Sequence, residues 1–253
     1  MSEKKQIIDL FLENVYGKKA DVSASNARHD GKAGHWLEQM MGIKANANNA
    51  PDLLGYEMKN DTTSKTTFGD WSANKYIFSK GNQYNLNRSE FLKIFGKANI
   101  EKGGRMSWSG EPVPKINAFN NFGQILEVDD LDNIGAYYYF SQDKRDTKAV
   151  IVPKEMQIEK LPLAIWNAES LKSKLEKKFN KNGWFKCKTD NNRIYTKIVF
   201  GEPICFETWI LLVKTGEVFF DSGMYETNKR PYSQWRASNG FWDSLVVDEF
   251  PKK

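Results

Sequence analysis

The chain has 253 residues, a net charge of +5 and a pI near 8.9, and 40% of its residues are hydrophobic. These values are typical of a globular protein with a large core, and the mildly basic charge suits a polyanionic partner without requiring one. Two cysteines and two histidines argue against a disulfide scaffold or a zinc site of ordinary ligand spacing. The sequence has no apolar leader and no run of membrane-spanning length, so we expect a cytoplasmic protein with no membrane contact.

The N-terminal part of the chain alternates helical and loop signals. Apolar residues spaced as on one helix face predict an amphipathic helix over residues 3–16. A loop rich in Ser, Asn, Ala and Gly follows over residues 17–31, and a second short helix over residues 32–41 ends before Gly42. An Ala- and Asn-rich connector over residues 44–50 then leads into a strand.

Further along, strand and helix signals alternate without an internal repeat or a low-complexity linker. Residues 64–87 are polar with short strand-like pieces, and residues 103–123 form a loop rich in Gly, Pro and Asn. Helices are predicted over residues 89–97 and 163–180. Strands are predicted over residues 136–140, 149–152, 194–200, 204–213 and 217–221. This order favours a mixed α/β (α+β) fold.

One short segment carries residues suited to metal-assisted hydrolysis of a phosphodiester. Asp52 follows Pro51, and Glu57 and Lys59 lie on the strand that comes next. Because successive strand side chains point to opposite faces, Glu57 and Lys59 share one face. Pro51 and Gly55 allow a turn that brings the Asp52 carboxylate alongside Glu57. Two carboxylates can hold a hard divalent cation and an ammonium can stabilise charge on a phosphate, so a nuclease is the leading hypothesis.

The same residues have a simpler interpretation. Asp52 could close a turn while Glu57 and Lys59 form a solvated strand face, since short motif matches arise by chance. The apolar neighbours of these residues indicate instead that the strand is half buried. A further acid, Glu38, lies near the edge of the apolar stripe of the helix upstream, where a solvent-facing role is also common.

Taken together, these residues are similar to a known active site. Glu38 on a short helix, Asp52 after a proline, and Glu57 two residues before Lys59 resemble the MutH-like branch of the PD-(D/E)xK nucleases. The closest pattern is that of the MvaI/BcnI-type type II restriction endonucleases, and the resemblance is strongest over residues 31–60. It implies a restriction-endonuclease-like core, with a central mixed sheet flanked by helices and two lobes around a DNA cleft.

The resemblance also implies roles for individual residues. Glu38, Asp52, Glu57 and Lys59 would be catalytic, and one or two Mg²⁺ ions would be held by Asp52, Glu57 and the backbone carbonyl of Met58. Glu38 would reach a second metal ion or a metal-bound water, and Lys59 would stabilise the attacking hydroxide or the charge on the phosphate. The expected products carry a 5′-phosphate and a 3′-hydroxyl.

The whole chain is expected to form a single nuclease domain. Its catalytic lobe would lie mainly around residues 1–80 and its recognition lobe mainly in residues 181–253. The C-terminal segment departs from the MvaI-type pattern, because that pattern carries a histidine where this chain has none.

Two segments contain candidates for contacts with double-stranded DNA. Arginine can bond guanine, and glutamine can bond adenine, in a bidentate geometry, while lysine can neutralise phosphate. The second segment is flanked by glycines and could close over DNA as a mobile loop. Ordinary surface charge is the alternative for any single residue. The candidates are Tyr225, Lys229, Arg230, Tyr232, Gln234 and Arg236 in the first segment and Arg105 and Trp108 in the second.

The leading function is therefore a bacterial, Mg²⁺-dependent type II restriction endonuclease, that is, a site-specific deoxyribonuclease that cleaves double-stranded DNA. A MutH-like mismatch-repair nicking endonuclease would share the chemistry but need partner proteins. A non-catalytic DNA-binding protein would use the same charged residues as surface ion pairs. A monomer or a homodimer is compatible with the sequence. A cognate DNA methyltransferase is expected as a functional rather than a physical partner.

Overall fold

The structure is a computed structural model of residues 1–253 that describes residues 2–23, 32–43 and 49–252. Parts of the predicted loop over residues 17–31 and of the predicted connector over residues 44–50 lie outside the described residues.

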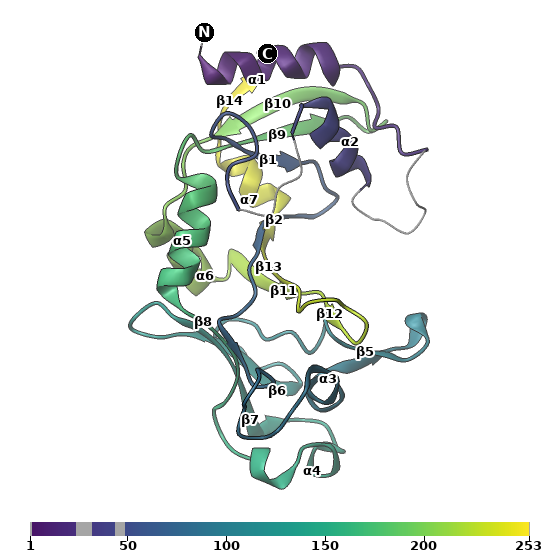
Figure 1. Cartoon of the computed structure of the whole chain (residues 1–253), viewed down its shortest axis with the longest axis vertical. Coiled ribbons are helices and arrows are strands. Elements are labelled where there is room, and N and C mark those ends of the chain that lie inside the picture. Colours follow the sequence, from purple (N-terminus) through teal and green to yellow (C-terminus); the bar gives the residue numbers. More distant parts are fainter. Residues whose placement is uncertain (1, 24–31, 44–48, 253) are drawn as a thin grey trace. The chain divides into compact units, whose positions relative to one another are not determined.

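The chain forms two compact units, and each unit combines segments that are far apart in sequence (Figure 1). Unit 1 consists of Met1–Thr66, Lys174–Phe206 and Ser238–Lys253, and unit 2 consists of Thr67–Ser173 and Glu207–Ala237. This division cuts across the lobe boundaries predicted from the sequence. Strands from the middle and the end of the chain complete the sheet that begins near residue 57, which no local sequence signal indicates.

Both helices and strands are distributed over the whole chain (Figure 1). The α-helices are α1 (Glu3–Asn14), α2 (Lys32–Met40), α3 (Arg88–Phe95), α4 (Lys148–Ile151), α5 (Ala168–Phe179), α6 (Phe206–Thr215) and α7 (Asn239–Ser244). Two short 3₁₀ helices are η1 (Ile100–Lys102) and η2 (Lys154–Met156). The strands are β1 (Glu57–Asn60), β2 (Lys65–Asp70), β3 (Lys75–Tyr76), β4 (Lys97–Asn99), β5 (Arg105–Trp108), β6 (Phe122–Val128), β7 (Ile134–Asp143), β8 (Leu161–Trp166), β9 (Trp184–Thr189), β10 (Tyr195–Gly201), β11 (Val218–Ser222), β12 (Met224–Tyr225), β13 (Ser233–Ser238) and β14 (Val246–Phe250).

The sheet of unit 1 has the strand order β1-β9-β10-β14. β1 pairs with β9 in parallel, while the other two pairings are antiparallel, so the sheet is mixed. One face packs against α1 and α2 in a core that includes Phe11, Leu37, Met58 and Phe185. Because strand side chains alternate, Glu57 and Lys59 lie on the opposite face from Met58, as the sequence predicted.

Unit 2 contains several smaller sheets with an aromatic core. The sheet β3-β8-β7-β6 is antiparallel, and two three-stranded sheets have the orders β11-β13-β2 and β12-β5-β4. Trp166 and Trp235 are fully buried, and their ring centroids lie 5.5 Å apart in an edge-to-face arrangement. Such aromatic pairs stabilise a core beyond their buried area.

Three predicted elements are wrong. Residues 149–151 lie in the helix α4 and residues 204–213 fall largely in the helix α6, whereas both segments were predicted as strands. The predicted helix over residues 163–180 is instead the strand β8 followed by the helix α5. Short apolar runs fit a buried helix and a strand equally well, and packing decides between them.

Within the described residues, none of the helices combines the length and the apolar character needed to cross a membrane.

Candidate active site

A tight turn folds Asp52 back onto the start of β1. Leu53 and Tyr56 exchange two backbone hydrogen bonds of 3.0 and 2.8 Å. Gly55 lies between them with φ of +82°, and a Cβ at this position would come within 2.7 Å of a neighbouring side chain, so the turn requires glycine. The turn places the Asp52 carboxylate where its Oδ2 accepts a 2.9 Å hydrogen bond from the backbone N–H of Met58.

Glu57 and Lys59 form a buried ion pair on β1. They are 2% and 8% exposed, and Lys59 Nζ donates a 2.8 Å hydrogen bond to Glu57 Oε1. The rings of Phe179 and Trp242 have their centroids 4.9 and 6.0 Å from the ammonium, within the range of cation–π attraction. The solvated strand face that served as the simpler interpretation is therefore wrong, because aromatic residues of α5 and α7 cover these charges.

A second lysine, Lys178 of α5, contacts the same carboxylate. Its Nζ lies 2.9 Å from Glu57 Oε1, so one carboxylate oxygen contacts two ammonium groups. Lys178 retains 20% side-chain exposure, whereas Lys59 retains 9%. Sequence reasoning missed this residue. The available signal was its place directly before the buried Phe179 in a helix that carries charge at its end.

The electrostatics of this group differ from those of surface charges. Burial, together with the negative charge of Glu57, raises the pKa of Asp52 to about 7, although the two lysines oppose this shift. Burial also lowers the pKa of Lys59, an effect that Glu57 opposes. The hydrogen bond from Met58 N–H holds the Asp52 carboxylate next to the residue that follows Glu57, which is the geometry that the turn at Gly55 was expected to allow.

The Asp52–Glu57 pair suits a divalent metal ion. Glu57 Oε2 is buried and has no hydrogen-bond partner among the described residues, so a carboxylate oxygen is available beside Asp52. A hard cation prefers such oxygens and neutralises the charge that burial makes unfavourable. The described part of the chain contains no group of three or more Asp, Glu, His or Cys residues that could hold a metal. Two carboxylates with water and a substrate oxygen are nevertheless a sufficient ligand set for Mg²⁺.

Glu38 does not join the carboxylate pair as a third member of such a group. Its Oε2 lies 3.3 Å from His35 Nδ1 one turn earlier on α2, and 39% of its side chain is exposed. The predicted role of Glu38 at a second metal ion stays a prediction.

A further buried lysine lies beside the pair. Lys186 of β9 is the register partner of Lys59 on β1, is 1% exposed, and has its Nζ 3.4 Å from Asp61 Oδ1. Parallel partners project to the same side of the sheet, so the face that carries Glu57 and Lys59 also carries Lys186.

In unit 2 the structure brings together two DNA-contact candidates from different segments. Tyr225 of β12 pairs with β5 opposite Ser107, and the Arg105 guanidinium lies 3.5 Å from the centroid of the Tyr225 ring. Glu226, which sequence reasoning missed, accepts a 3.0 Å hydrogen bond from Met106 N and joins the two strands. Because β5 is a paired strand, the predicted mobile loop is wrong at Arg105.

The other candidates near the C-terminus lie on or just before β13. Arg230 forms a 2.8 Å ion pair with Asp70 and contacts the Tyr232 ring, with half of its own side chain exposed. Arg236 lies 3.2 Å from Asp221 and also contacts Gln234. Lys229 is exposed. These arginines are thus held by carboxylates in the DNA-free chain.

Trp108 is not a DNA-contact residue in this structure. It is completely buried, and its indole N–H donates a 2.6 Å hydrogen bond to Gln124 Oε1, which is also buried. The prediction for Trp108 is wrong because alternation along β5 turns this side chain into the aromatic core next to Phe91 and Phe220.

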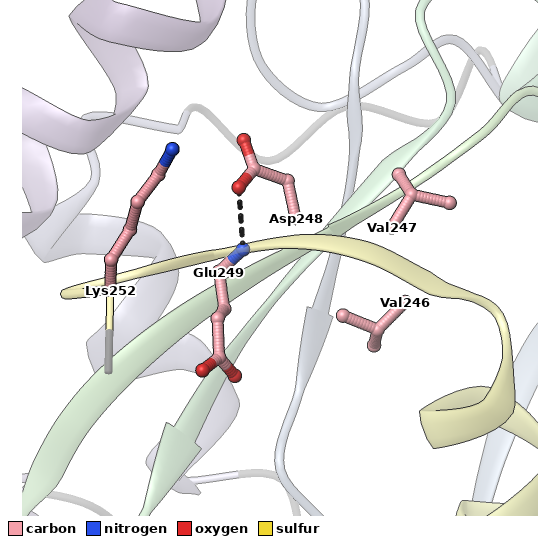
Figure 2. Close-up of a pocket in the computed structure, with 5 residues that line it drawn as sticks. All are labelled: Val246, Val247, Asp248, Glu249 and Lys252. Atoms are coloured by element: carbon pink, nitrogen blue, oxygen red, sulfur yellow. Dashed lines mark hydrogen bonds between the residues drawn. The ribbon is translucent and has the colours of Figure 1, made fainter.

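An open groove of about 450 Å³ lies beside β14 in unit 1 (Figure 2). Figure 2 shows Asp248 turned back toward the backbone N–H of Glu249, which donates a 2.9 Å hydrogen bond to its carboxylate. None of the predicted catalytic residues lines this groove, whose walls are Val246, Val247, Asp248, Glu249 and Lys252.

Comparison with known proteins agrees with the resemblance. The family described as LlaMI restriction endonuclease matches residues 15–250 of this chain. The type II restriction enzyme ScrFI of Lactococcus lactis subsp. cremoris is 50% identical over 97% of this chain and 97% of its own. The structure of restriction endonuclease MvaI in complex with its cognate DNA covers 98% of each chain with a TM-score of 0.61 at 14% identity.

These matches decide the fold and the family. The likeness to MvaI confirms the predicted mixed α/β fold of the PD-(D/E)xK type. The 50% sequence identity to ScrFI extends over 97% of this chain. Unrelated proteins do not reach such an identity over this length by chance. The prediction of a type II restriction endonuclease, a site-specific deoxyribonuclease, is confirmed at the level of the family. This chain belongs to the LlaMI restriction endonuclease family.

Proposed function

We propose that this chain cleaves double-stranded DNA at a specific sequence, with one or two Mg²⁺ ions held by Asp52, Glu57 and the Met58 carbonyl. The observation that carries this proposal is the half-buried Asp52 next to the buried Glu57, with Lys59 hydrogen-bonded to Glu57. The name of ScrFI and the cognate DNA in the MvaI complex support DNA as the substrate. Type II restriction endonucleases generally depend on a metal ion, and the choice of Mg²⁺ rests on the two carboxylates as hard oxygen ligands.

The residues of the site divide the work of hydrolysis. When bound, Mg²⁺ polarises the phosphodiester and lowers the pKa of a water molecule. Glu57 holds Lys59 in one position through the 2.8 Å hydrogen bond, and the rings of Phe179 and Trp242 restrict its motion. Lys59 then stabilises the charge that grows on the phosphate, because a fixed ammonium in a site with little water acts strongly on developing charge. The products carry a 5′-phosphate and a 3′-hydroxyl.

Glu38 is the proposed ligand of a second metal ion or of a metal-bound water. Support comes from its place on α2, which packs with β1 in the core of unit 1, and from its partly exposed carboxylate. In the metal-free chain the Glu38 carboxylate contacts His35.

Sequence recognition is proposed for the exposed basic and aromatic side chains of unit 2. Arg105 and Tyr225 lie together on paired strands, while Arg230 and Arg236 present guanidinium groups next to carboxylates. Arginine can bind guanine at O6 and N7 in a bidentate geometry. Tyr232, Gln234 and Lys229 complete this set.

The proposal also includes a DNA methyltransferase as a functional partner and the oligomeric state of the chain. A cognate DNA methyltransferase would protect the host DNA without binding this chain. The chain acts as a monomer or as a homodimer, and cutting one strand at a time would suit the monomer.

The test is digestion of plasmid DNA by the purified chain with Mg²⁺ or with EDTA. We expect discrete fragments with Mg²⁺ and intact plasmid with EDTA, and sequencing of the fragment ends gives the site and the cut position. Nicked circles alone would favour the repair type of enzyme. Plasmid that is bound but uncut under all metal conditions would contradict the proposal in favour of a non-catalytic DNA-binding protein.

A further inference from the structure

Glu57 contacts more positive charge than its pairing with Lys59 provides. One oxygen, Oε1, lies 2.8 Å from Lys59 Nζ and 2.9 Å from Lys178 Nζ, although the carboxylate is only 2% exposed. Two ammonium groups on one oxygen repel each other, and a buried carboxylate with a single partner is already paired. The second ammonium therefore balances a further negative charge, which the neighbouring Asp52 carboxylate supplies when it is ionised.

The two lysines differ in how firmly they are held. The Lys59 ammonium lies under the rings of Phe179 and Trp242 at the centre of a strand. Lys178 comes from α5, and its flexible side chain retains 20% exposure, compared with 9% for Lys59. Of the two, Lys178 is the one whose ammonium can reach a ligand without unpacking aromatic rings.

The charge of the site also changes during the proposed reaction. Above about pH 7, where Asp52 is ionised, Asp52 and Glu57 together carry two negative charges, which Lys59 and Lys178 balance before a metal ion is present. A divalent cation on Asp52 and Glu57 takes over that balance, and the ammonium of Lys178 is then repelled from Glu57. The nearest new anion is the phosphate backbone of the substrate, for which lysine is a suitable partner.

We propose that Lys178 is a second active-site lysine, which neutralises Glu57 in the metal-free chain and binds a backbone phosphate of the DNA once a divalent cation occupies the carboxylates. The inference rests on the proposed nuclease function. It assigns to α5 a phosphate contact that local sequence did not indicate.

The first test measures Mn²⁺ binding to the full-length chain without DNA, by titration followed with electron paramagnetic resonance. Lys178→Met removes the competing positive charge with little change of shape, and we expect Mn²⁺ affinity to rise by about three- to tenfold. Lys177→Met on the exposed neighbouring position is the matched control and should leave the affinity unchanged. In a Glu57→Gln background Lys178→Met should have no effect, because the carboxylate that couples lysine and metal is absent.

The second test measures the salt dependence of DNA binding with Ca²⁺ in place of Mg²⁺. Loss of one phosphate contact should reduce the slope of log K against log salt by about 0.9 in Lys178→Met. Without a divalent cation the slopes of the variant and the wild type should agree, because Lys178 then stays on Glu57. With Mg²⁺, cleavage by Lys178→Met should fall at least tenfold, and Lys178→Arg should retain most of it.

Several results would overturn the inference. They are an unchanged or weaker Mn²⁺ affinity in Lys178→Met, an unchanged salt slope with Ca²⁺, or cleavage at the wild-type rate. If Lys178→Met fails to fold, as judged by circular dichroism, Lys178→Gln replaces it because it keeps a polar end. Failure of the nuclease function is distinguishable, since a wild-type chain that never cleaves DNA still gives a readable Mn²⁺ titration.

Discussion

The two units use charge in opposite ways. In unit 1 two of the proposed catalytic residues, Glu57 and Lys59, are buried and are hydrogen-bonded to each other beneath aromatic rings. In unit 2 the proposed recognition residues are partly exposed, and each arginine rests on a carboxylate or a ring at the surface. A buried group acts strongly because it is fixed in surroundings of low dielectric constant, whereas a surface pair exchanges its partner at little cost. We therefore expect substitutions in unit 1 to affect whether DNA is cut, and substitutions in unit 2 to affect where it is cut.

The largest effect is expected at the carboxylate–lysine group. Asp52→Ala, Glu57→Ala and Lys59→Ala should each reduce cleavage on the order of 10³-fold or more, because each removes a metal ligand or the ammonium that stabilises the phosphate. DNA binding, measured by a gel-shift titration, should remain largely intact. Full cleavage by the Lys59→Ala chain in Mg²⁺ would contradict the assignment of this residue.

The next largest effect is expected for substitutions of the surface arginines, which should change the sequence preference. Arg230→Ala or Arg236→Ala should lose about 1–3 kcal/mol of discrimination at one base pair, as expected for a lost bidentate contact. Cleavage of a library of single-base variants of the site measures this preference. If both chains cut the same sites at the wild-type rate, recognition lies elsewhere in the molecule.

A substitution of Trp108 tests whether this residue belongs to the core or to the recognition surface. Trp108→Phe removes the 2.6 Å hydrogen bond to Gln124 and leaves a buried amide oxygen without that donor. The free energy of unfolding should fall by about 2 kcal/mol, measured by urea denaturation, while the preferred DNA sequence stays the same. If the Trp108→Phe chain has wild-type stability but cuts at a different sequence, the assignment of Trp108 to the core alone is contradicted.

Arg105 should have a smaller effect, on affinity rather than on stability. Arg105→Ala removes the guanidinium that stacks on Tyr225, and we expect DNA affinity to fall about tenfold with a lower salt dependence. Arg105→Lys should recover part of the salt dependence but not the stacking. Lys154→Ala, at an exposed position in η2, is the control for loss of surface charge. Equal affinities of all four chains would remove Arg105 from the recognition surface.

The smallest expected effect is a pH-dependent change of stability at Asp52. Its pKa is raised to about 7, so the folded chain binds a proton between about pH 4 and 7 that the unfolded chain has lost. The contribution of the protonated Asp52 carboxyl to the free energy of unfolding is thus fully present at low pH, and it is lost as the pH rises through 7. Asp52→Asn keeps an acceptor for Met58 N–H and should stabilise the metal-free chain more at pH 8 than at pH 5.

Thermal unfolding in EDTA at the two pH values measures this difference. Asp130→Asn is the matched control because Asp130 lies at an exposed position. A larger gain at pH 5 than at pH 8 would show that the Asp52 carboxyl is not held in its neutral form by the site.

Sequence reasoning succeeded where structure follows from neighbouring residues. Helix α1, strand β1 and the turn at Gly55 were predicted because apolar spacing, strand alternation and glycine act over a few residues. It failed for α6, where the run Trp209-Ile210-Leu211-Leu212-Val213 is apolar enough to satisfy either a strand or a buried helix. Packing in unit 2 buries Trp209 and Val213 four residues apart, which is the helical solution.

The sequence by itself determined the family resemblance and the shared face of Glu57 and Lys59, because both depend on a spacing within a dozen residues. Only the tertiary structure decided that these charges are buried, that Lys178 contacts the same oxygen, and that Arg105 lies against Tyr225. Each of these contacts joins residues more than a hundred positions apart. No period or motif encodes such a contact; it exists because strands and helices from distant segments bury their apolar faces together.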